Sequence, residues 1–341
     1  MERNESAKSM RISLNVERVH LPNLDLLRVL AALAVCFFHL SWEGEDWFAQ
    51  SFSYGYLGVN VFFCISGFIT PLAMTWAGYH YRDAMKFFWS RMVRLYPVFA
   101  VTALITVILF AARNWMFAGG FENQDLGFWR LFANFTWTAD FYKEDWLVPV
   151  FWTLGVEGQF IIFMLLTFPL WVHRSHLVRA AVYALWVIPP ILLKDYPAFD
   201  VTIFHYSAMF AMGVTIFWRY QKVCSEWVFL ILLGAAFYVH HEFASSMAAR
   251  VSLGTALCVA YLPDIHSRVV AYFGRLTYSF FLIHITVGGT VMYHLRSVPN
   301  EWTYQLPMML IATAVAVLAS VALHKWVEKP CHQLARRLKA K

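Results

Sequence analysis

The chain has 341 residues, of which 60% are hydrophobic and 14% charged. Soluble domains carry about a quarter charged residues, so this composition excludes an ordinary water-soluble protein. Many apolar stretches approach the roughly 20 residues that a helix needs to cross a bilayer, and the alternating segments of an outer-membrane barrel are not seen. We therefore predict an all-α integral membrane protein. The net charge of +6 comes from Lys and Arg in short loops, which indicates orientation in a bilayer and gives no reason to expect a nucleic-acid partner.

Hydropathy predicts ten membrane spans with both termini cytoplasmic. With this topology the large majority of the 27 Lys and Arg residues fall on the inner side, as the positive-inside rule requires. Residues 1–22 are predicted to be a cytoplasmic tail, 23–330 a single transmembrane domain, and 331–341 a basic cytoplasmic tail. The spans are approximately 24–42, 56–77, 97–117, 148–171, 177–193, 201–218, 226–241, 247–262, 272–295 and 306–326.

The first span carries Arg28 and, eleven residues later, His39. Eleven steps of about 100° bring both side chains to one helix face, roughly 16 Å apart along the axis. Arg28 then lies near the cytoplasmic boundary and His39 in the outer half of the membrane. Arg28 either extends to lipid phosphate or binds an anion, and His39 is either a structural hydrogen-bonding group or a general base.

The second span contains "GVNVFFCISGF", in which Asn60 needs a polar partner and Gly67 suits close helix packing. The following segment, "YHYRDAMKFFWSRMVRLYP", is rich in cations and aromatic residues and suits an interfacial helix, with Pro97 at the start of the third span. Arg91 and Arg94 share one face of it. They form either part of the ordinary positive-inside belt or a phosphate clamp for an anionic cytosolic cofactor.

Two later spans hold further ionisable residues. Glu157, near Trp152 in the fourth span, must be paired or protonated in the membrane. Alone it suits structural pairing as well as catalysis, whereas beside a histidine it would orient the base. His284 lies in the ninth span, and His205 and His324 are expected to be structural. No Cys or His spacing predicts a metal site, and an odd number of five cysteines, the first two of which lie inside apolar segments, does not suggest disulfides.

These segments together resemble the acyltransferase-3 family of membrane O-acyltransferases, which acylate sugars and other acceptors. The similar segments, in chain order, are "LDLLRVLAALAVCFFH", "GVNVFFCISGF", "SRMVRLYP", "FWTLGVEGQF", "GRLTYSFFLIH" and "WVEKP". Three positions depart from the family pattern. Asn60 replaces an Asp, Gly158 a second Glu, and Thr153 a Ser.

The resemblance implies a multi-pass enzyme of the plasma (inner) membrane, without a metal, that takes an acyl group from cytosolic acyl-CoA, commonly acetyl-CoA. The acceptor would be a hydroxyl of a carbohydrate or glycolipid. Arg28, Arg91 and Arg94 would hold the donor's phosphates, His39 would act as general base, and Glu157 would fix its tautomer. Asn60, Trp152 and His284 are candidates for substrate binding.

Two other classes of protein also fit some of these residues. A proton-coupled transporter uses intramembrane Arg, His and Glu as well, but the chain shows no inverted repeat. A sensory or scaffolding protein would hold the same residues for structure alone, and the ordered set of motifs argues against it.

Overall fold

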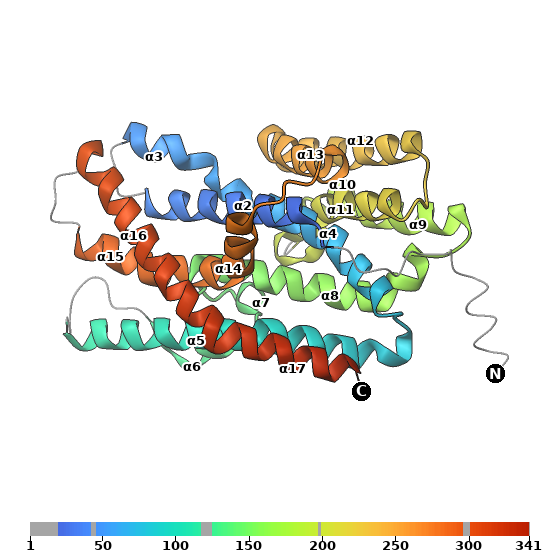
Figure 1. Ribbon diagram of the computed structural model, residues 1–341. Helices are drawn as coiled ribbons and strands as arrows, with labels where there is room; N and C mark the ends of the chain where they lie inside the picture. Colours follow the sequence, from blue (N-terminus) through green and yellow to red (C-terminus); the bar gives the residue numbers. More distant parts are fainter. Residues whose placement is uncertain (1–19, 42–45, 117–124, 197–198, 296–300, 341) are drawn as a thin grey trace. The chain divides into compact units, whose positions relative to one another are not determined.

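The computed structural model describes residues 20–41, 46–116, 125–196, 199–295 and 301–340, whose regular secondary structure is helical (Figure 1). The predicted all-α fold is confirmed. In the first half the helices are α2 (Pro22–Leu40), α3 (Asp46–Phe52), α4 (Gly58–Trp76), α5 (Ala84–Met116), α6 (Phe128–Phe135), α7 (Ala139–Tyr142), α8 (Trp152–Trp171), α9 (His176–Val187) and α10 (Pro189–Leu193). In the second half they are α11 (Ser207–Tyr220), α12 (Glu226–Phe243), α13 (Ser246–Tyr261), α14 (Arg268–His284), α15 (Thr290–His294), α16 (Trp302–Leu323) and α17 (Lys329–Ala340), with π-helical turns η6 (Ile285–Gly289) and η7 (His324–Glu328).

The described parts of the ten predicted spans are largely helical, and in the described residues seven helical stretches are long and apolar enough to cross a membrane. The predicted spans 201–218, 226–241 and 247–262 correspond to α11, α12 and α13, which have 14, 18 and 16 residues. These helices are shorter than the roughly 20 residues that a helix needs to cross a bilayer. The count of ten and the cytoplasmic placement of both termini therefore stay predictions. The seven stretches are Pro22–Leu40, Trp47–Trp76, Tyr81–Arg113, Pro149–Trp171, His176–Leu193, Arg268–His294 and Trp302–Arg337.

The prediction of an interfacial helix separate from the third span is wrong, while the point at which this span enters the membrane stays a prediction. Helix α5 runs unbroken over 33 residues and contains Pro97 in its interior. Proline removes one hydrogen bond from a helix, but a chain in lipid must bond its remaining backbone groups internally, and this favours continuing the helix on both sides. Arg91 and Arg94 consequently stand on the same helix as the apolar residues that follow.

The contacts divide the chain into two compact units. The first comprises the residues up to Leu27, Asn60–Phe88 and Val156–Ile265, and the second comprises Arg28–Val59, Trp89–Gly155 and the residues from His266 onward. Four helices, α2, α4, α5 and α8, contribute residues to both units.

Helix α11 forms the centre of the first unit, since every residue from Ser207 to Trp218 is buried. It crosses α4 at two glycines. A Cβ on Gly67 would lie 2.2 Å from the carbonyl oxygen of Phe210, and one on Gly213 would lie 2.1 Å from that of Cys64. The two backbones thus touch directly, which confirms the packing role predicted for Gly67.

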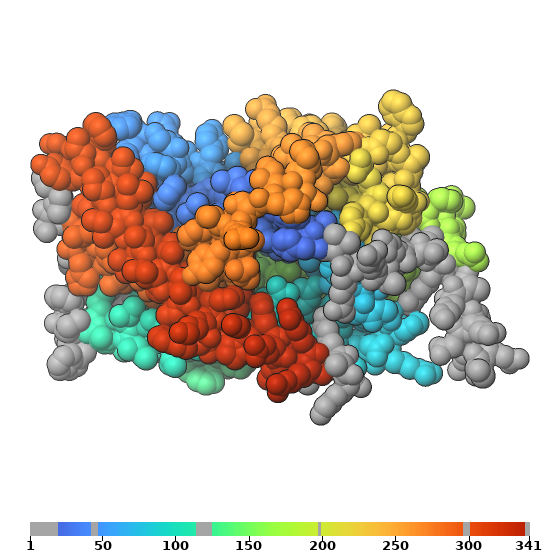
Figure 2. Space-filling model, viewed as in Figure 1, coloured from blue at the N-terminus to red at the C-terminus, as the bar shows by residue number. Residues whose placement is uncertain are grey.

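The second unit is held together by polar contacts between helices far apart in sequence. The hydroxyl of Tyr278 on α14 donates to the carbonyl oxygen of Leu95 on α5, at 2.7 Å. The buried sulfur of Cys36 on α2 lies 3.8 Å from the hydroxyl of Thr313 on α16. Helix α14 packs against α16, and in Figure 2 the side chains of this C-terminal part, orange to red, adjoin over one face.

The close crossing at Gly213 generates a prediction. Replacing Gly213 by Ala forces a methyl group against a backbone carbonyl, and we expect the free energy of unfolding to fall by about 1–3 kcal/mol. Fluorescence-detected size exclusion of heated, detergent-solubilised protein measures this loss. Gly234→Ala is the matched control, because no atom lies within 4 Å of a Cβ at Gly234. Equal melting temperatures for the two variants would contradict the close-contact explanation.

Candidate functional site

His39 lies at the end of α2, half-buried, with its ring beside that of His284. The two ring centroids are 5.6 Å apart and the ring planes meet at 45°. The sequence places these histidines 245 positions apart along the chain and gives no reason to pair them. Packing in the second unit therefore brings together the predicted general base and one of the three residues predicted to bind substrate.

His284 is wholly buried, and the hydrogen bond it makes fixes its tautomer. Its Nδ1 lies 2.8 Å from the carbonyl oxygen of Phe281. Since a carbonyl can only accept, Nδ1 carries the hydrogen, and Nε2 of the neutral ring keeps its lone pair. Among the residues that the structure describes, Nε2 has no hydrogen-bond partner. An unsatisfied buried acceptor is costly, and this one belongs to a ring that lies beside that of His39.

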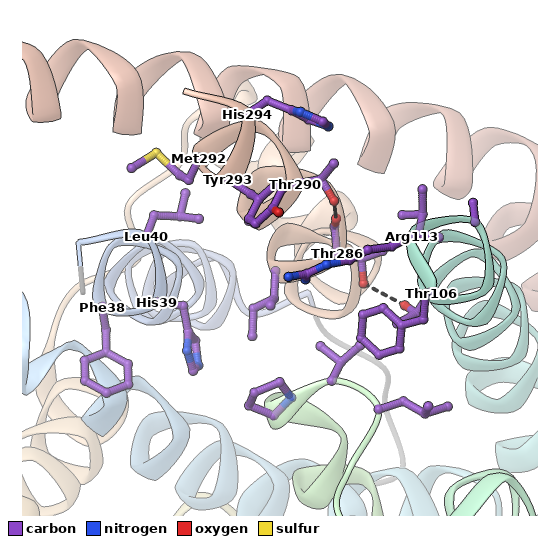
Figure 3. A pocket seen from close by; sticks show the side chains of 18 residues that line it. Phe38, His39, Leu40, Thr106, Arg113, Thr286, Thr290, Met292, Tyr293 and His294 are labelled. Carbon is purple, nitrogen blue, oxygen red and sulfur yellow. Dashed lines mark hydrogen bonds between the residues drawn. The ribbon is translucent and has the colours of Figure 1, made fainter. Parts of the chain in front are cut away.

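A cavity of about 620 Å³ opens beside His39 (Figure 3). Its walls come from four segments of the second unit, namely the end of α2, the second half of α5, residues 147–149 before α8, and the chain from η6 into α15. Figure 3 shows His39 on one side of the cavity, with Thr106 and Arg113 of α5 on the other. Most of the lining is apolar, as for Leu40, Phe110 and Val148. The volume is in the range of cavities that hold drug-sized ligands, about 300–1,000 Å³.

The three threonines of the cavity wall use their hydroxyl hydrogens within the protein. Thr106 donates to the carbonyl oxygen of Thr102 at 3.0 Å, and its oxygen lies 2.9 Å from that of Thr286. The shared contact is therefore a hydrogen bond donated by Thr286. Thr290 donates to the carbonyl oxygen of Thr286 at 2.5 Å. These groups can accept hydrogen bonds from a ligand but have no hydrogen left to offer it.

The cavity also has a polar side formed by Arg113, Tyr293 and His294. The guanidinium of Arg113 lies 4.6 Å from the ring centroid of Tyr293, within the range of a cation–π contact. Along the chain, the turn η6 lies between His284 and Tyr293. Turns of this π-helical kind frequently occur at functional sites.

The predicted phosphate-binding arginines lie on the same helices as the cavity, nearer their N-terminal ends. Arg28 precedes His39 on α2, and Arg91 and Arg94 precede Thr106 on α5. Arg91 is buried, while Arg94 is exposed and donates from Nε to Nε2 of His332 at 3.1 Å. On α5 the rise from Arg94 to Thr106 is roughly 18 Å. The arginines and the cavity are thus separated along both helices.

Sequence reasoning missed a buried carboxylate near Arg94. Glu328 is 3% exposed, accepts from the hydroxyl of Ser279 at 2.6 Å, and contacts Nδ1 of His324 at 3.0 Å. Its other oxygen lies 3.6 Å from Nε2 of His332. The signal was present, because His324, Glu328 and His332 recur every fourth residue at the end of an apolar span and so share a helix face. The contact with Glu328 gives His324 a partner inside the protein, and the structural role expected for it stays a prediction.

The remaining predicted residues are Asn60, Trp152 and Glu157. Asn60 is buried in the first unit, where its amide nitrogen lies 3.2 Å from Nε2 of His240 and 3.4 Å from Oγ of Ser252. The predicted need for a polar partner is met inside the protein. Glu157 belongs to the first unit, whereas Trp152 belongs to the second, with His39. An interaction of Glu157 with His39 stays a prediction, as do the substrate-binding roles of Asn60 and Trp152. In the described ranges no cluster of His, Cys, Asp and Glu is arranged to hold a metal ion.

Substitution of Glu328 should destabilise the second unit. Glu328→Ala leaves the buried hydroxyl of Ser279 and the ring of His324 without their acceptor, and a buried unsatisfied group costs about 1–3 kcal/mol. We expect a lower melting temperature for purified protein in detergent. Glu242→Ala serves as the control, because Glu242 pairs with His241 at an exposed position. If the Glu328→Ala protein has the same melting temperature as the wild type, the network around Glu328 adds no stability.

Comparison with known proteins gives the family. The model described as an acyltransferase domain, that of the acyltransferase-3 family, matches residues 21–322. The acyltransferase MdmB of Streptomyces mycarofaciens is 26% identical over 94% of this chain and 93% of its own length. The peptidoglycan O-acetyltransferase OatA of Listeria monocytogenes is 28% identical over 53% of this chain and 30% of its own. No solved structure matches. The chain belongs to the acyltransferase-3 family, and it is an enzyme of the O-acetyltransferase class.

Proposed function

We propose that this protein moves an acyl group, in the first place acetyl, from cytosolic acyl-CoA to a hydroxyl of a carbohydrate acceptor at the plasma membrane. The observation that carries the proposal is the arrangement of His39, which stands at the edge of a ligand-sized cavity and eleven residues after Arg28 on the same helix. Membership of an acyltransferase family supports an enzyme over the proton-coupled transporter that the sequence left open.

The arginines are proposed to bind the donor. The diphosphate and ribose phosphate of an acyl-CoA require cations, and guanidinium groups bind phosphate through paired hydrogen bonds. Arg94 is exposed, and its contact with His332 restrains the side chain from one side. Arg28 and Arg91 add positive charge on α2 and α5. From there the thin pantetheine arm would carry the thioester along the helices toward His39, a rise of roughly 16 Å from Arg28.

His39 is proposed to be the general base. Its neutral imidazole takes the proton of the acceptor hydroxyl as the oxygen attacks the thioester carbonyl carbon. The new C–O bond forms, the C–S bond breaks, and the imidazolium returns the proton to the departing thiolate. The ester and free CoA are the products. Histidine suits both halves of this cycle because one imidazole can accept a proton and then give it back.

His284 is proposed to position His39. The rings are in contact, and the tautomer of His284 leaves Nε2 as an acceptor of hydrogen. Such a neighbour accepts from the N–H opposite the base nitrogen of His39, which favours one orientation of the ring and stabilises the imidazolium that forms during the reaction. Glu157 is the alternative orienting group proposed from the sequence, and it would act as carboxylates do in other histidine-based sites.

Substitution of the histidines tests the roles proposed for them. Loss of a general base lowers turnover by about 10²–10⁴-fold, so His39→Ala should abolish measurable acetyl transfer to the glycans of expressing cells. His284→Ala should lower it less, because His39 remains. Incorporation of radiolabelled acetyl groups is normalised to the amount of protein in the membrane, with the exposed His241→Ala as control. Near-wild-type transfer by His39→Ala would remove His39 as the base and bring Glu157 or His284 forward.

The donor site has a separate test. Removing a charged hydrogen-bonding group costs about 1.5–3 kcal/mol, so Arg94→Ala should raise the KM for acetyl-CoA by about 10–100-fold with little change in kcat. Purified protein in proteoliposomes is assayed for acetyl-CoA consumption. Arg82→Ala is the control, since Arg82 is exposed and lies outside α5. An equal KM for both variants would place the donor phosphates elsewhere.

A further inference from the structure

We propose that the C-terminal helix docks on the headgroups of anionic phospholipids, and that this contact braces Arg94 through His332. The lipid contact is argued from the structure alone, while its effect on Arg94 rests on the proposed function, in which Arg94 binds the donor. The docking surface, here called the basic face, consists of exposed side chains of η7 and α17, namely Lys325, Trp326, Lys329, Arg336 and Arg337.

Helix length places the basic face at the surface of the bilayer. The helical stretch Trp302–Arg337 has 36 residues, which gives a rise of roughly 54 Å. The hydrocarbon core of a bilayer is about 30 Å thick and takes about 20 residues. Helix α16 carries no charged residue and suits the core, and in Figure 1 α17 continues beyond it toward the end of the chain. The turn η7 and α17 therefore emerge among the headgroups.

The charge of this segment selects an anionic partner. From His324 to Arg337 the sequence holds four Lys and Arg residues and one acidic residue, Glu328. Glu328 is 3% exposed and bonds to Ser279 and His324, so the exposed charge of the segment is positive throughout. Clusters of four to eight cations beside a membrane helix bind anionic headgroups, and each cation strengthens the binding about fivefold.

Two large apolar side chains beside these cations favour a lipid over a free anion. Trp326 is 72% exposed and Leu334 is 50% exposed. Residues 329, 333, 336 and 337 share one face of α17, and Leu334 borders it. Tryptophan is enriched at headgroup level, and a helix with cations next to Trp and Leu is typical of one that lies in that layer. A free anion would pair with the cations but leave the indole in water.

The opposite face of α17 holds the helix against the protein and reaches the proposed donor site. Ala335 is buried there. Nε2 of His332 accepts from Nε of Arg94 at 3.1 Å and lies 3.6 Å from Oε1 of Glu328. A long arginine side chain loses rotamer freedom when it is held in one place. A lipid that fixes α17 also fixes His332, so part of this loss precedes donor binding, and His332 is a positioning residue.

Trp326 can report on its own lipid neighbours. The full chain is reconstituted in phosphatidylcholine containing a minor fraction of phosphatidylglycerol, and one or the other lipid carries bromine on its acyl chains, which quenches tryptophan on contact. Subtracting the emission of Trp326→Phe isolates the signal of Trp326. We expect brominated phosphatidylglycerol to quench this signal by more than its share of the bilayer, because the basic face concentrates that lipid.

Two charge-neutralising variants test the cause of this preference. Lys325→Gln/Lys329→Gln should lower the relative affinity for phosphatidylglycerol by about fivefold for each cation removed. Lys194→Gln/Arg250→Gln is the matched control, since both of these cations are exposed and lie outside η7 and α17. Quenching of wild-type Trp326 in proportion to lipid share, or an equal preference in both double variants, would overturn the lipid site.

The effect on Arg94 is measured as the KM for acetyl-CoA in the same proteoliposomes. Phosphatidylglycerol should lower the KM of the wild type with little change in kcat, even though its charge repels an anionic donor from the bilayer. His332→Ala should abolish this response, and His332→Gln, whose amide oxygen can still accept from Arg94, should restore part of it.

The outcomes separate the lipid site from the proposed function. A wild-type KM that ignores phosphatidylglycerol, with the quenching preference intact, removes the link through His332. Protein that consumes no acetyl-CoA in either bilayer contradicts the proposed function, while the quenching of Trp326 still decides whether the basic face binds anionic lipid.

Discussion

An apolar environment offers no hydrogen bonds, so each polar group of this chain that enters it must find a partner inside the protein. The described residues largely obey this constraint. Tyr79 donates to the carbonyl oxygen of Leu165, the indole of Trp218 to that of Trp171, and Glu328 is surrounded by Ser279 and two histidines. These bonds connect segments far apart in sequence and so fix which helices are neighbours. Several buried polar atoms of the described residues have no hydrogen-bond partner, and the Nε2 of His284, whose ring lies beside that of His39, is one of them.

The same two helices carry both halves of the proposed reaction. Cations are stable near the membrane boundary, where phosphate and water can reach them, while a base that must act on an alcohol works in a dry cavity. The spacing of Arg28 from His39 and of Arg94 from Thr106 satisfies both requirements with continuous helix. Because α5 does not break at Pro97, the distance between its arginine and its cavity wall is fixed by the helical rise and not by a loop.

Irregular helix marks both ends of this arrangement. The π-helical turn η6 begins directly after His284 and supplies cavity-lining residues. The turn η7 ends at Glu328, four residues before His332, whose ring contacts Arg94. A π-helical turn shifts the register of the side chains that follow it, at a cost in hydrogen-bond geometry. Here it lets one helix bury His284 and still direct Thr290 and Tyr293 into the cavity.

The sequence by itself determined the fold class, the helical segments, the family and the residues that carry charge into the membrane. These follow from local quantities: apolar length, helical periodicity, and ordered motifs such as Arg28 with His39. It did not determine the pairing of His39 with His284, the network around Glu328, or the cavity, because each joins residues from separate helices. Only tertiary packing decides which helix faces meet. The continuity of α5 through Pro97 also depends on the tertiary structure. Proline usually lies at helix ends, but a chain in lipid must keep its backbone hydrogen-bonded, and this favours a helix that continues past the proline.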